Sequence, residues 1–152
     1  MTHYNGFTPA ERNAAQAWLN REWTAGRLAR PSVCLACGQD QGVIDAHAED
    51  YSRPFTAAKL MAFPLCLICH LMLHCRFGSG RAAWDAYRRL TRLGCRYEPA
   101  RTRNFGIVQA MLAGRPRSFE VLDEAPTRFV LDEIHEGLHV PKTVAPRDLF
   151  TA

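Results

Sequence analysis

Four cysteines fall in two C-x2-C pairs whose spacing is typical of a metal site. The pairs are Cys34/Cys37 and Cys66/Cys69, with 28 residues between them. A tight turn between cysteines two residues apart points both thiolates to one side, and four thiolates make the closed tetrahedral site of structural zinc. We therefore predict a zinc site at these four cysteines. Four buried thiols, or two disulfides, account less well for the paired spacing.

Three histidines belong to the same stretch of chain. His47 lies between the two cysteine pairs, and His70 and His74 follow the second pair with a spacing of four residues. On a helix, this spacing places both imidazoles on one face, one turn apart. The stretch from residue 34 to residue 76 is therefore the richest in groups that could do chemistry.

Positive charge is concentrated directly after this stretch. Residues 76–117 contain ten arginines and only two acidic side chains, whereas residues 118–152 are acidic on balance. The planar fork of arginine suits phosphate, and a basic block beside a metal site is typical of nucleic-acid binding. A solvated helix face, balanced by the acidic C-terminal arm, is the alternative interpretation. The arginines that we expect to contact nucleic acid are Arg76, Arg81, Arg88, Arg89, Arg92 and Arg96.

Size and composition predict a single cytoplasmic domain. The chain has 152 residues, of which 47% are hydrophobic, and this suits one core of ordinary size. No apolar run approaches the roughly 20 residues that a membrane span requires, and the first residues lack a secretory signal pattern. We therefore expect no membrane partner. In a reducing compartment cysteines indicate metal before disulfides, and Cys75 and Cys95 are expected to be inert buried thiols.

Local signals predict the elements that must position these groups. Thr8, Pro9 and Glu11 form a capping box with proline at the first helical position, which predicts a helix to about Ala25 within an N-terminal unit of residues 1–30.

The cysteine-rich stretch is expected to fold as a compact zinc core over residues 31–77. Residues 43–47 alternate as a short strand, and residues 57–63 suit a short helix that Pro64 ends. Residues 66–77 have a helical pattern, which places the second cysteine pair at the start of a helix.

Beyond this core we expect arginine-rich helices in residues 78–117, at about 81–93 and 104–113. Residues 118–152 are expected to form an acidic β-hairpin and an extended tail. The sequence therefore predicts an α+β protein in which helices surround a small zinc core and a C-terminal β-hairpin follows.

The order of these features resembles the HNH nuclease motif, also called the ββα-metal or His-Me finger, in its phage-type version with two C-x2-C pairs. The resemblance covers about 43 of the 152 residues and implies a ββα-metal zinc core. The flanking helices and the C-terminal hairpin lie outside it. The residues that carry it are Ala46-His47-Ala48-Glu49-Asp50-Tyr51-Ser52-Arg53-Pro54 and Leu65-Cys66-x-x-Cys69-His70-x-x-x-His74.

The resemblance also implies a second, catalytic metal site. By position, His47, His70 and His74 correspond to ligands of a divalent ion, which would be Mg²⁺, Mn²⁺, Ni²⁺ or Zn²⁺. Such an ion stabilises charge on a scissile phosphate and its leaving oxygen, while a neighbouring imidazole activates water.

Two positions depart from the family pattern. Ala48 stands where the general-base histidine is expected, and Met61 stands where an asparagine orients that base. An alanine cannot accept a proton, and a thioether cannot orient an imidazole. Two ways of compensating stay open. His47 could serve as base with Asp45 as ligand, because the two share a strand face, or one of the two acidic residues after Ala48 could replace the missing group.

Two functions from different classes therefore stay open. The chain could be a metal-dependent DNA endonuclease, or nickase, of a phage, plasmid or other mobile element. It could instead be a degenerate HNH scaffold that binds nucleic acid, or a protein partner, without cutting, and so acts as a regulator or inhibitor. The changes at Ala48 and Met61 favour the scaffold, whereas the three histidines favour the nuclease.

Overall fold

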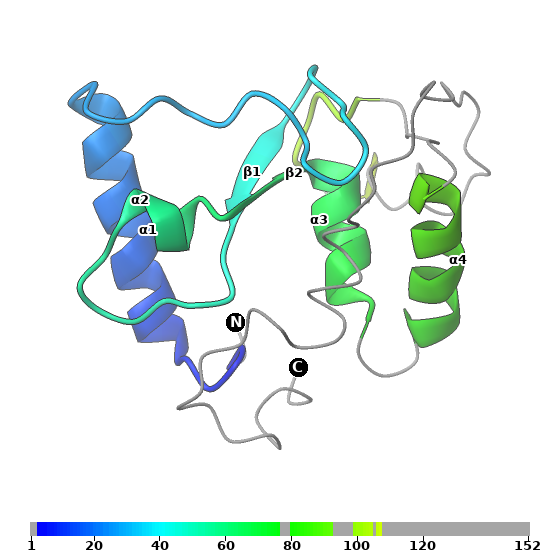
Figure 1. Cartoon of the computed structure of the whole chain (residues 1–152), viewed down its shortest axis with the longest axis horizontal. Helices are drawn as coiled ribbons and strands as arrows, with labels where there is room; N and C mark the ends of the chain where they lie inside the picture. Colours follow the sequence, from blue (N-terminus) through cyan, green and yellow to red (C-terminus); the bar gives the residue numbers. More distant parts are fainter. Residues whose placement is uncertain (1–2, 77–79, 93–98, 105, 108–152) are drawn as a thin grey trace.

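The computed structural model describes residues 3–76, 80–92, 99–104 and 106–107 (Figure 1). These residues form helices and a two-stranded antiparallel sheet, so the predicted α+β class is confirmed. The predicted C-terminal hairpin, Cys95, Arg96 and most of the predicted helix at 104–113 lie outside the described residues. The elements in chain order are α1 (Pro9–Thr24), β1 (Ile44–His47), α2 (Ala57–Leu60), β2 (Phe63–Cys66), α3 (Leu67–His74) and α4 (Arg81–Arg92).

Helix α1 begins as the capping-box prediction requires. The Thr8 hydroxyl accepts from the Glu11 backbone N–H at 3.2 Å, and the Glu11 carboxylate accepts from the Thr8 backbone N–H at 2.8 Å. The side chains of Ala15 and Leu19 are buried along one face of the helix. The opposite face of α1 stays accessible, because buried residues occupy only this one stripe.

The local signals did not place the second strand, β2, although the ββα order implied by the resemblance contains two strands. Strand β2 pairs antiparallel with β1, with Ile44 opposite Cys66 and His47 opposite Phe63. The helix expected over residues 57–63 ends at Leu60, and Phe63 already belongs to the strand. Pro64 is tolerated because a two-stranded sheet consists of edge strands, where a proline need not donate to the ladder. Its carbonyl still accepts from the Leu35 N–H at 2.7 Å.

Two separate hydrophobic clusters hold the described residues together. The larger one surrounds the four paired cysteines and includes Leu65, Trp84 and Tyr87, so it joins β2 and α3 to α4. The smaller one packs α1 against α2 and the residues after β1. In Figure 1, the sheet and α3 lie between α1 on one side and α4 on the other. The histidines of β1 and α3 therefore lie between the two hydrophobic clusters.

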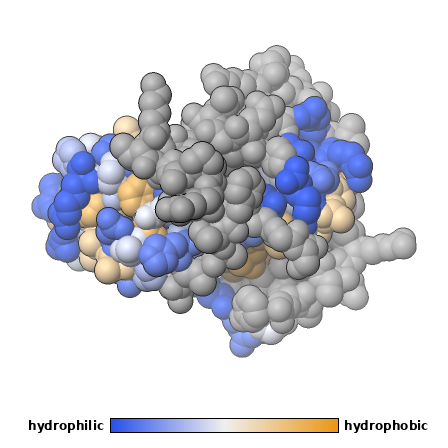
Figure 2. Space-filling model, turned by 90° about the horizontal axis from the view of Figure 1, so that it is seen from below, coloured by the Kyte–Doolittle hydropathy of each residue, from blue (hydrophilic) through white to orange (hydrophobic). Residues whose placement is uncertain are grey.

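Two of the arginines of α4 share one acidic partner on the same helix. Trp84, Tyr87 and Thr91 form the buried face of α4. On its outer side, Arg81 and Arg88 both contact Asp85, with N–O distances of 3.4 and 3.2 Å. Figure 2 shows hydrophilic and apolar side chains interspersed on the described part of one face of the molecule. Among the described residues, no helix is long and apolar enough to cross a membrane.

Candidate metal centres

The four paired cysteines come together as predicted and could hold a metal ion. All four are buried and free, and their sulfur atoms lie within 4.8 Å of one another. The Sγ atoms of Cys37 and Cys66 are 3.9 Å apart. This is far beyond a disulfide bond and close to the roughly 3.8 Å edge of a tetrahedron with Zn–S bonds of about 2.3 Å. Four converging thiols therefore fit a zinc ion, and the two-disulfide interpretation is wrong for these cysteines.

Local backbone structure holds both cysteine pairs in place. Gly38 follows the first pair with a φ of 75°, and its N–H donates to the carbonyl of Cys34 at 2.9 Å. Cys66 caps helix α3, and its sulfur accepts from the backbone N–H of Cys69 at 3.5 Å. Burial raises the pKa of the Cys69 thiol, so a cation among the sulfurs is what would keep that thiol ionised.

Cys75 lies outside this set. It is only partly buried, and its thiol donates to the carbonyl of Leu71 at 3.4 Å. Burial raises the pKa of the Cys75 thiol, which agrees with the expectation of an inert thiol.

The three histidines also converge. His47 Nδ1 lies 3.2 Å from His70 Nε2, and His70 Nε2 lies 3.1 Å from His74 Nε2. Ligands bound at about 2.0–2.1 Å in a tetrahedral zinc site are separated by roughly 3.4 Å. One nitrogen from each ring therefore faces a common point, and the set could hold a metal ion.

Carboxylates engage the outer nitrogens of two of these rings. His47 Nε2 lies 2.6 Å from the Glu49 carboxylate, and His70 Nδ1 lies 2.9 Å from the Asp45 carboxylate. A carboxylate on one ring nitrogen places the proton there and leaves the lone pair of the other nitrogen free for a metal. Burial lowers the pKa of His47 to about 4, so its imidazole is neutral at pH 7, as a ligand must be.

This geometry bears on the roles left open for His47 and Asp45. Both ring nitrogens of His47 are engaged and the residue is 1% exposed, which favours a metal ligand over a base. Asp45 shares a strand face with His47 as expected. However, its carboxylate contacts the outer nitrogen of His70 and the guanidinium of Arg103. Asp45 is therefore placed to orient a ring, and the arrangement does not support it as a ligand.

A buried polar network fixes Glu49 and was missed by the sequence reasoning. Asn5 and Gly6 form a tight turn with positive φ angles, which returns the N-terminal segment onto the site. The Tyr4 hydroxyl donates to Glu49 at 2.6 Å, and the Asn5 amide also donates to this carboxylate. Glu49 is 2% exposed, so it holds His47 and has no access to a substrate.

Arg76 belongs to the same network, which corrects one prediction. It is 5% exposed and donates to the Tyr4 hydroxyl at 2.5 Å and to the Glu49 carboxylate at 3.2 Å. A buried carboxylate needs a cation nearby, and Arg76 supplies it. Arg76 therefore does not lie on a phosphate-binding surface. Of the other predicted arginines, Arg89 and Arg92 are exposed on α4, and Arg81 and Arg88 contact Asp85.

Ala48 and Met61, the two positions that depart from the HNH pattern, both pack in the smaller hydrophobic cluster. Ala48 is 1% exposed and lies in the cluster that contains Ala15 and Leu19 of α1. Met61 packs against the same cluster. An imidazole at residue 48 would therefore compete with α1 for space, which accounts physically for the small side chain.

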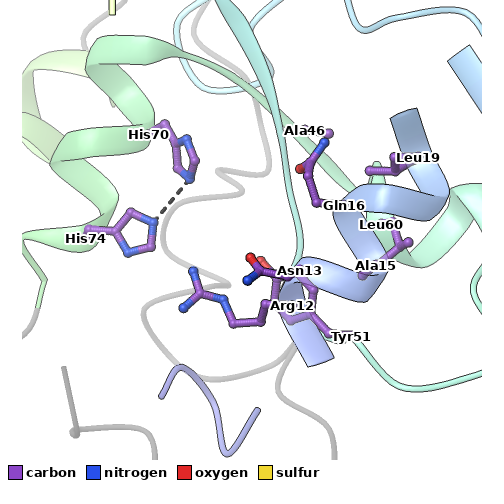
Figure 3. A pocket seen from close by; sticks show the side chains of 10 residues that line it. All are labelled: Arg12, Asn13, Ala15, Gln16, Leu19, Ala46, Tyr51, Leu60, His70 and His74. Carbon is purple, nitrogen blue, oxygen red and sulfur yellow. Dashed lines mark hydrogen bonds between the residues drawn. The ribbon is translucent and has the colours of Figure 1, made fainter. Parts of the chain in front are cut away.

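Two adjoining clefts open beside the histidines. One, of about 180 Å³, is lined by Arg12, Tyr51, His70 and His74 among others. The second, of about 530 Å³, is lined by polar and aromatic residues of α1 together with Asp45, His70 and Arg103. Figure 3 shows the first cleft with α1 on one side and the two histidines of α3 on the other. His70 lines both clefts and His74 lines the first, whereas the buried His47 lines neither.

Comparisons with protein-family models, curated proteins and solved structures found no match to this chain.

Proposed function

We propose that the chain is a zinc-stabilised, HNH-like protein that binds nucleic acid and hydrolyses DNA phosphodiester bonds. The observation that carries this proposal is the convergence of His47, His70 and His74, whose inner ring nitrogens lie within 4.8 Å of one another beside a cleft that His70 and His74 line. A purely structural zinc protein has no need of a second set of this kind.

The order of elements supports the same family. Strand β1 ends at His47, strand β2 ends at Cys66, and α3 carries the remaining two histidines. This is the ββα order of the HNH motif, with the four-cysteine site at the base of the helix. Zinc at the cysteines would hold β2 and α3 in register, which fixes the spacing between the histidines.

The residues of the chain have distinct tasks in this proposal. The three histidines would hold a divalent ion, which would act as a Lewis acid on a phosphate oxygen. Glu49 and Asp45 fix the tautomers of His47 and His70, respectively. Since Ala48 cannot accept a proton, we expect cleavage roughly 10²–10⁴-fold slower than with an imidazole at that position.

The burial of Ala48 favours a second candidate function. Because residue 48 is packed against α1, a small movement of the chain would not make room there for a general base. On this alternative, the chain is a degenerate HNH scaffold that binds nucleic acid, or a protein partner, without cutting.

Cleavage of supercoiled plasmid separates the two functions. The full chain is incubated with Mg²⁺, Mn²⁺, Ni²⁺ or Zn²⁺, beside His70→Ala and a matched control, His3→Ala, which changes an exposed histidine outside the three-histidine set. Nicking by the wild type and by His3→Ala, but not by His70→Ala, supports the nuclease. A folded, zinc-loaded wild type that cuts with none of these ions would show that it is a scaffold.

Metal counting gives an independent result. We expect two bound ions per chain in the wild type after incubation with Zn²⁺, and one in His70→Ala, measured by elemental analysis after gel filtration. One ion in both proteins would argue against the second site.

A further inference from the structure

The two clefts beside the histidines share a wall. Gln16 of α1, Ala46 of β1 and His70 of α3 line both of them. The clefts therefore adjoin along the length of α1, with His70 at their junction. Helix α1, Arg30 and Arg103 lie outside the stretch that resembles the HNH motif.

We propose that these clefts form one phosphate-binding groove for a nucleic-acid strand, with α1 as its outer wall. The strand would contact Arg12 at one end and Arg30 at the other. This inference rests on the proposed function in taking nucleic acid as the ligand. It differs from the sequence expectation, because it moves phosphate binding from α4 to residues on both sides of His70.

Charge along the groove favours an anion. Asp45 is the only acidic residue among those that line the two clefts, and its carboxylate is already engaged by His70 and Arg103. The two glutamates of α1 are committed elsewhere. Glu11 caps the helix at Thr8, and Glu22 contacts Arg27 at 2.7 Å. The charge that α1 presents to the clefts is therefore that of Arg12.

Arg12 is held in position at the end nearer His74. Its guanidinium lies 5.3 Å from the ring centre of Tyr4 and 5.7 Å from that of Tyr51. Figure 3 shows the Arg12 side chain extending from α1 toward the side of the cleft that carries His74. An arginine restrained between two aromatic rings loses little conformational freedom when it binds a phosphate.

Uncharged donors continue along the same face of α1. Asn13, Gln16 and Asn20 are exposed and line the clefts, and Gln16 donates to Asn20 at 3.0 Å. Together with Arg12 and Trp23, they follow the three- and four-residue spacing of one helix face. Amide side chains of this kind donate to phosphate oxygens and to base edges.

Trp23 gives an independent observation at the other end. It lines the larger cleft, with the Arg30 guanidinium 4.6 Å from its ring centre. Its indole N–H is buried and has no acceptor among the described residues. A buried N–H without an acceptor is unfavourable, so this end of the larger cleft carries an unsatisfied donor.

Helix α4 is a poorer phosphate site among the described residues. Two of its arginines contact Asp85, and it packs on the side of α3 away from α1 (Figure 1). A strand held on α4 would therefore lie away from the histidines. Arg89 and Arg92, which are exposed there, provide matched controls for the arginines of the groove.

Binding is measured by fluorescence anisotropy with labelled DNA duplex, single-stranded DNA and single-stranded RNA. No divalent cation is added, so that binding is read without cleavage. We expect Arg12→Gln and Arg30→Gln to weaken binding to the preferred probe about tenfold each, and Arg89→Gln and Arg92→Gln to leave it within twofold. The slope of log K against log[salt] should fall by about one for each groove arginine removed. Zinc content and thermal midpoint are checked for every variant.

Intrinsic fluorescence reports on the position of the strand directly. We expect unlabelled DNA to quench tryptophan emission in the wild type and in Trp18→Phe, whose ring packs in the apolar cluster beside α1. The quenching should disappear in Trp23→Phe. Quenching that persists without Trp23 would place the strand elsewhere.

The outcomes distinguish this groove from the proposed function. Tight binding that depends on Arg12 and Arg30, without plasmid cleavage, would support the groove and contradict the proposed nuclease activity. Cleavage accompanied by loss of binding in Arg89→Gln and Arg92→Gln, but not in the groove variants, would retain the nuclease and overturn the groove. A folded wild type that binds none of the three probes would overturn the groove as well.

Discussion

At the scale of single residues, the histidine set is defined as much by the carboxylates behind it as by the rings themselves. Asp45 is partly buried and receives hydrogen bonds from His70 and Arg103. Burial alone would raise the pKa of Asp45, but these hydrogen bonds lower it to about 2, so the carboxylate is charged at neutral pH. A charged acceptor holds the His70 proton on the outer nitrogen.

Asp45→Asn tests this orienting role. The amide is a weaker acceptor for the His70 N–H, so we expect the affinity of the histidine site for Zn²⁺ to fall about 10- to 100-fold, measured by titration calorimetry. Asp85→Asn on α4 is the matched control and should leave the affinity unchanged. Unchanged affinity in Asp45→Asn would mean that His70 needs no partner.

Arg76→Met tests the assignment of Arg76 to the buried network. The substitution removes the cation beside the Glu49 carboxylate, so we expect the free energy of unfolding to fall by about 3–5 kcal/mol in urea denaturation. Arg89→Met removes an exposed arginine and should change it by less than about 0.5 kcal/mol. If Arg76→Met weakened DNA binding and left stability unchanged, Arg76 would instead be a phosphate-binding residue of the surface.

At the scale of elements, a close backbone contact brings Arg103 to the site. The N–H of Val43 donates to the carbonyl of Ala100 at 2.8 Å, directly before β1. Gly42 has a φ of 72°, and a Cβ there would lie 2.4 Å from the same carbonyl oxygen. The absence of a side chain at Gly42 therefore allows residues 99–103 to lie against the start of β1.

Gly42→Ala should disturb this contact more than backbone strain alone explains. Gly26 has nearly the same φ, 71°, but a Cβ there would meet nothing within 4 Å. Gly26→Ala should therefore show only the strain of the left-handed conformation, roughly 1–2 kcal/mol. We expect Gly42→Ala to lose about 1–3 kcal/mol more, by urea denaturation, because the chain must also move away from the added methyl group. Equal losses would show that the contact is easily relaxed.

At the scale of the whole molecule, the cysteine site lies inside the larger hydrophobic cluster. The cluster joins both cysteine pairs to Trp84 and Tyr87 of α4, so α4 depends on the same centre as the sheet. Zinc there would add folding free energy directly, since structural zinc sites bind with about 10–16 kcal/mol whereas whole domains are stable by only about 5–15 kcal/mol.

Cys66→Ser should therefore abolish cooperative unfolding as well as zinc binding. We expect no thermal transition by circular dichroism and no retained zinc by elemental analysis. Cys75→Ser changes a cysteine outside the set, and a serine can also donate to Leu71, so it should retain both. A folded Cys66→Ser protein without zinc would show that the apolar cluster suffices.

What could be predicted from sequence depended on whether the signal was local. The start of α1 and the cysteine set were predicted because a capping box and a C-x2-C pair each lie within one turn of chain. The grouping of His47 with His70 and His74 came instead from the resemblance to the HNH motif, because His47 is 23 residues from His70. The position of strand β2 was missed because Pro64 is typical of a helix end, and the tolerance of a proline in an edge strand depends on a partner strand far along the sequence.

The buried network could not be predicted for a related reason. Tyr4 and Glu49 are 45 residues apart, and Tyr4 and Arg76 are 72 apart, so no periodic pattern joins them. Arg76 was counted with its neighbours in sequence as surface charge, although its partner is a carboxylate inside the protein. The only available signal was Glu49 itself, an acidic residue among positions that become buried.

The distances along the chain within this network also set an order in time. During synthesis Tyr4 leaves the ribosome first, yet the carboxylate and the guanidinium that it contacts emerge much later. All four zinc cysteines have been made once residue 69 is added, before Arg76 exists. The zinc centre can therefore form first. The N-terminal segment stays in water until Arg76 has been made, and only then can it pack against the histidine site.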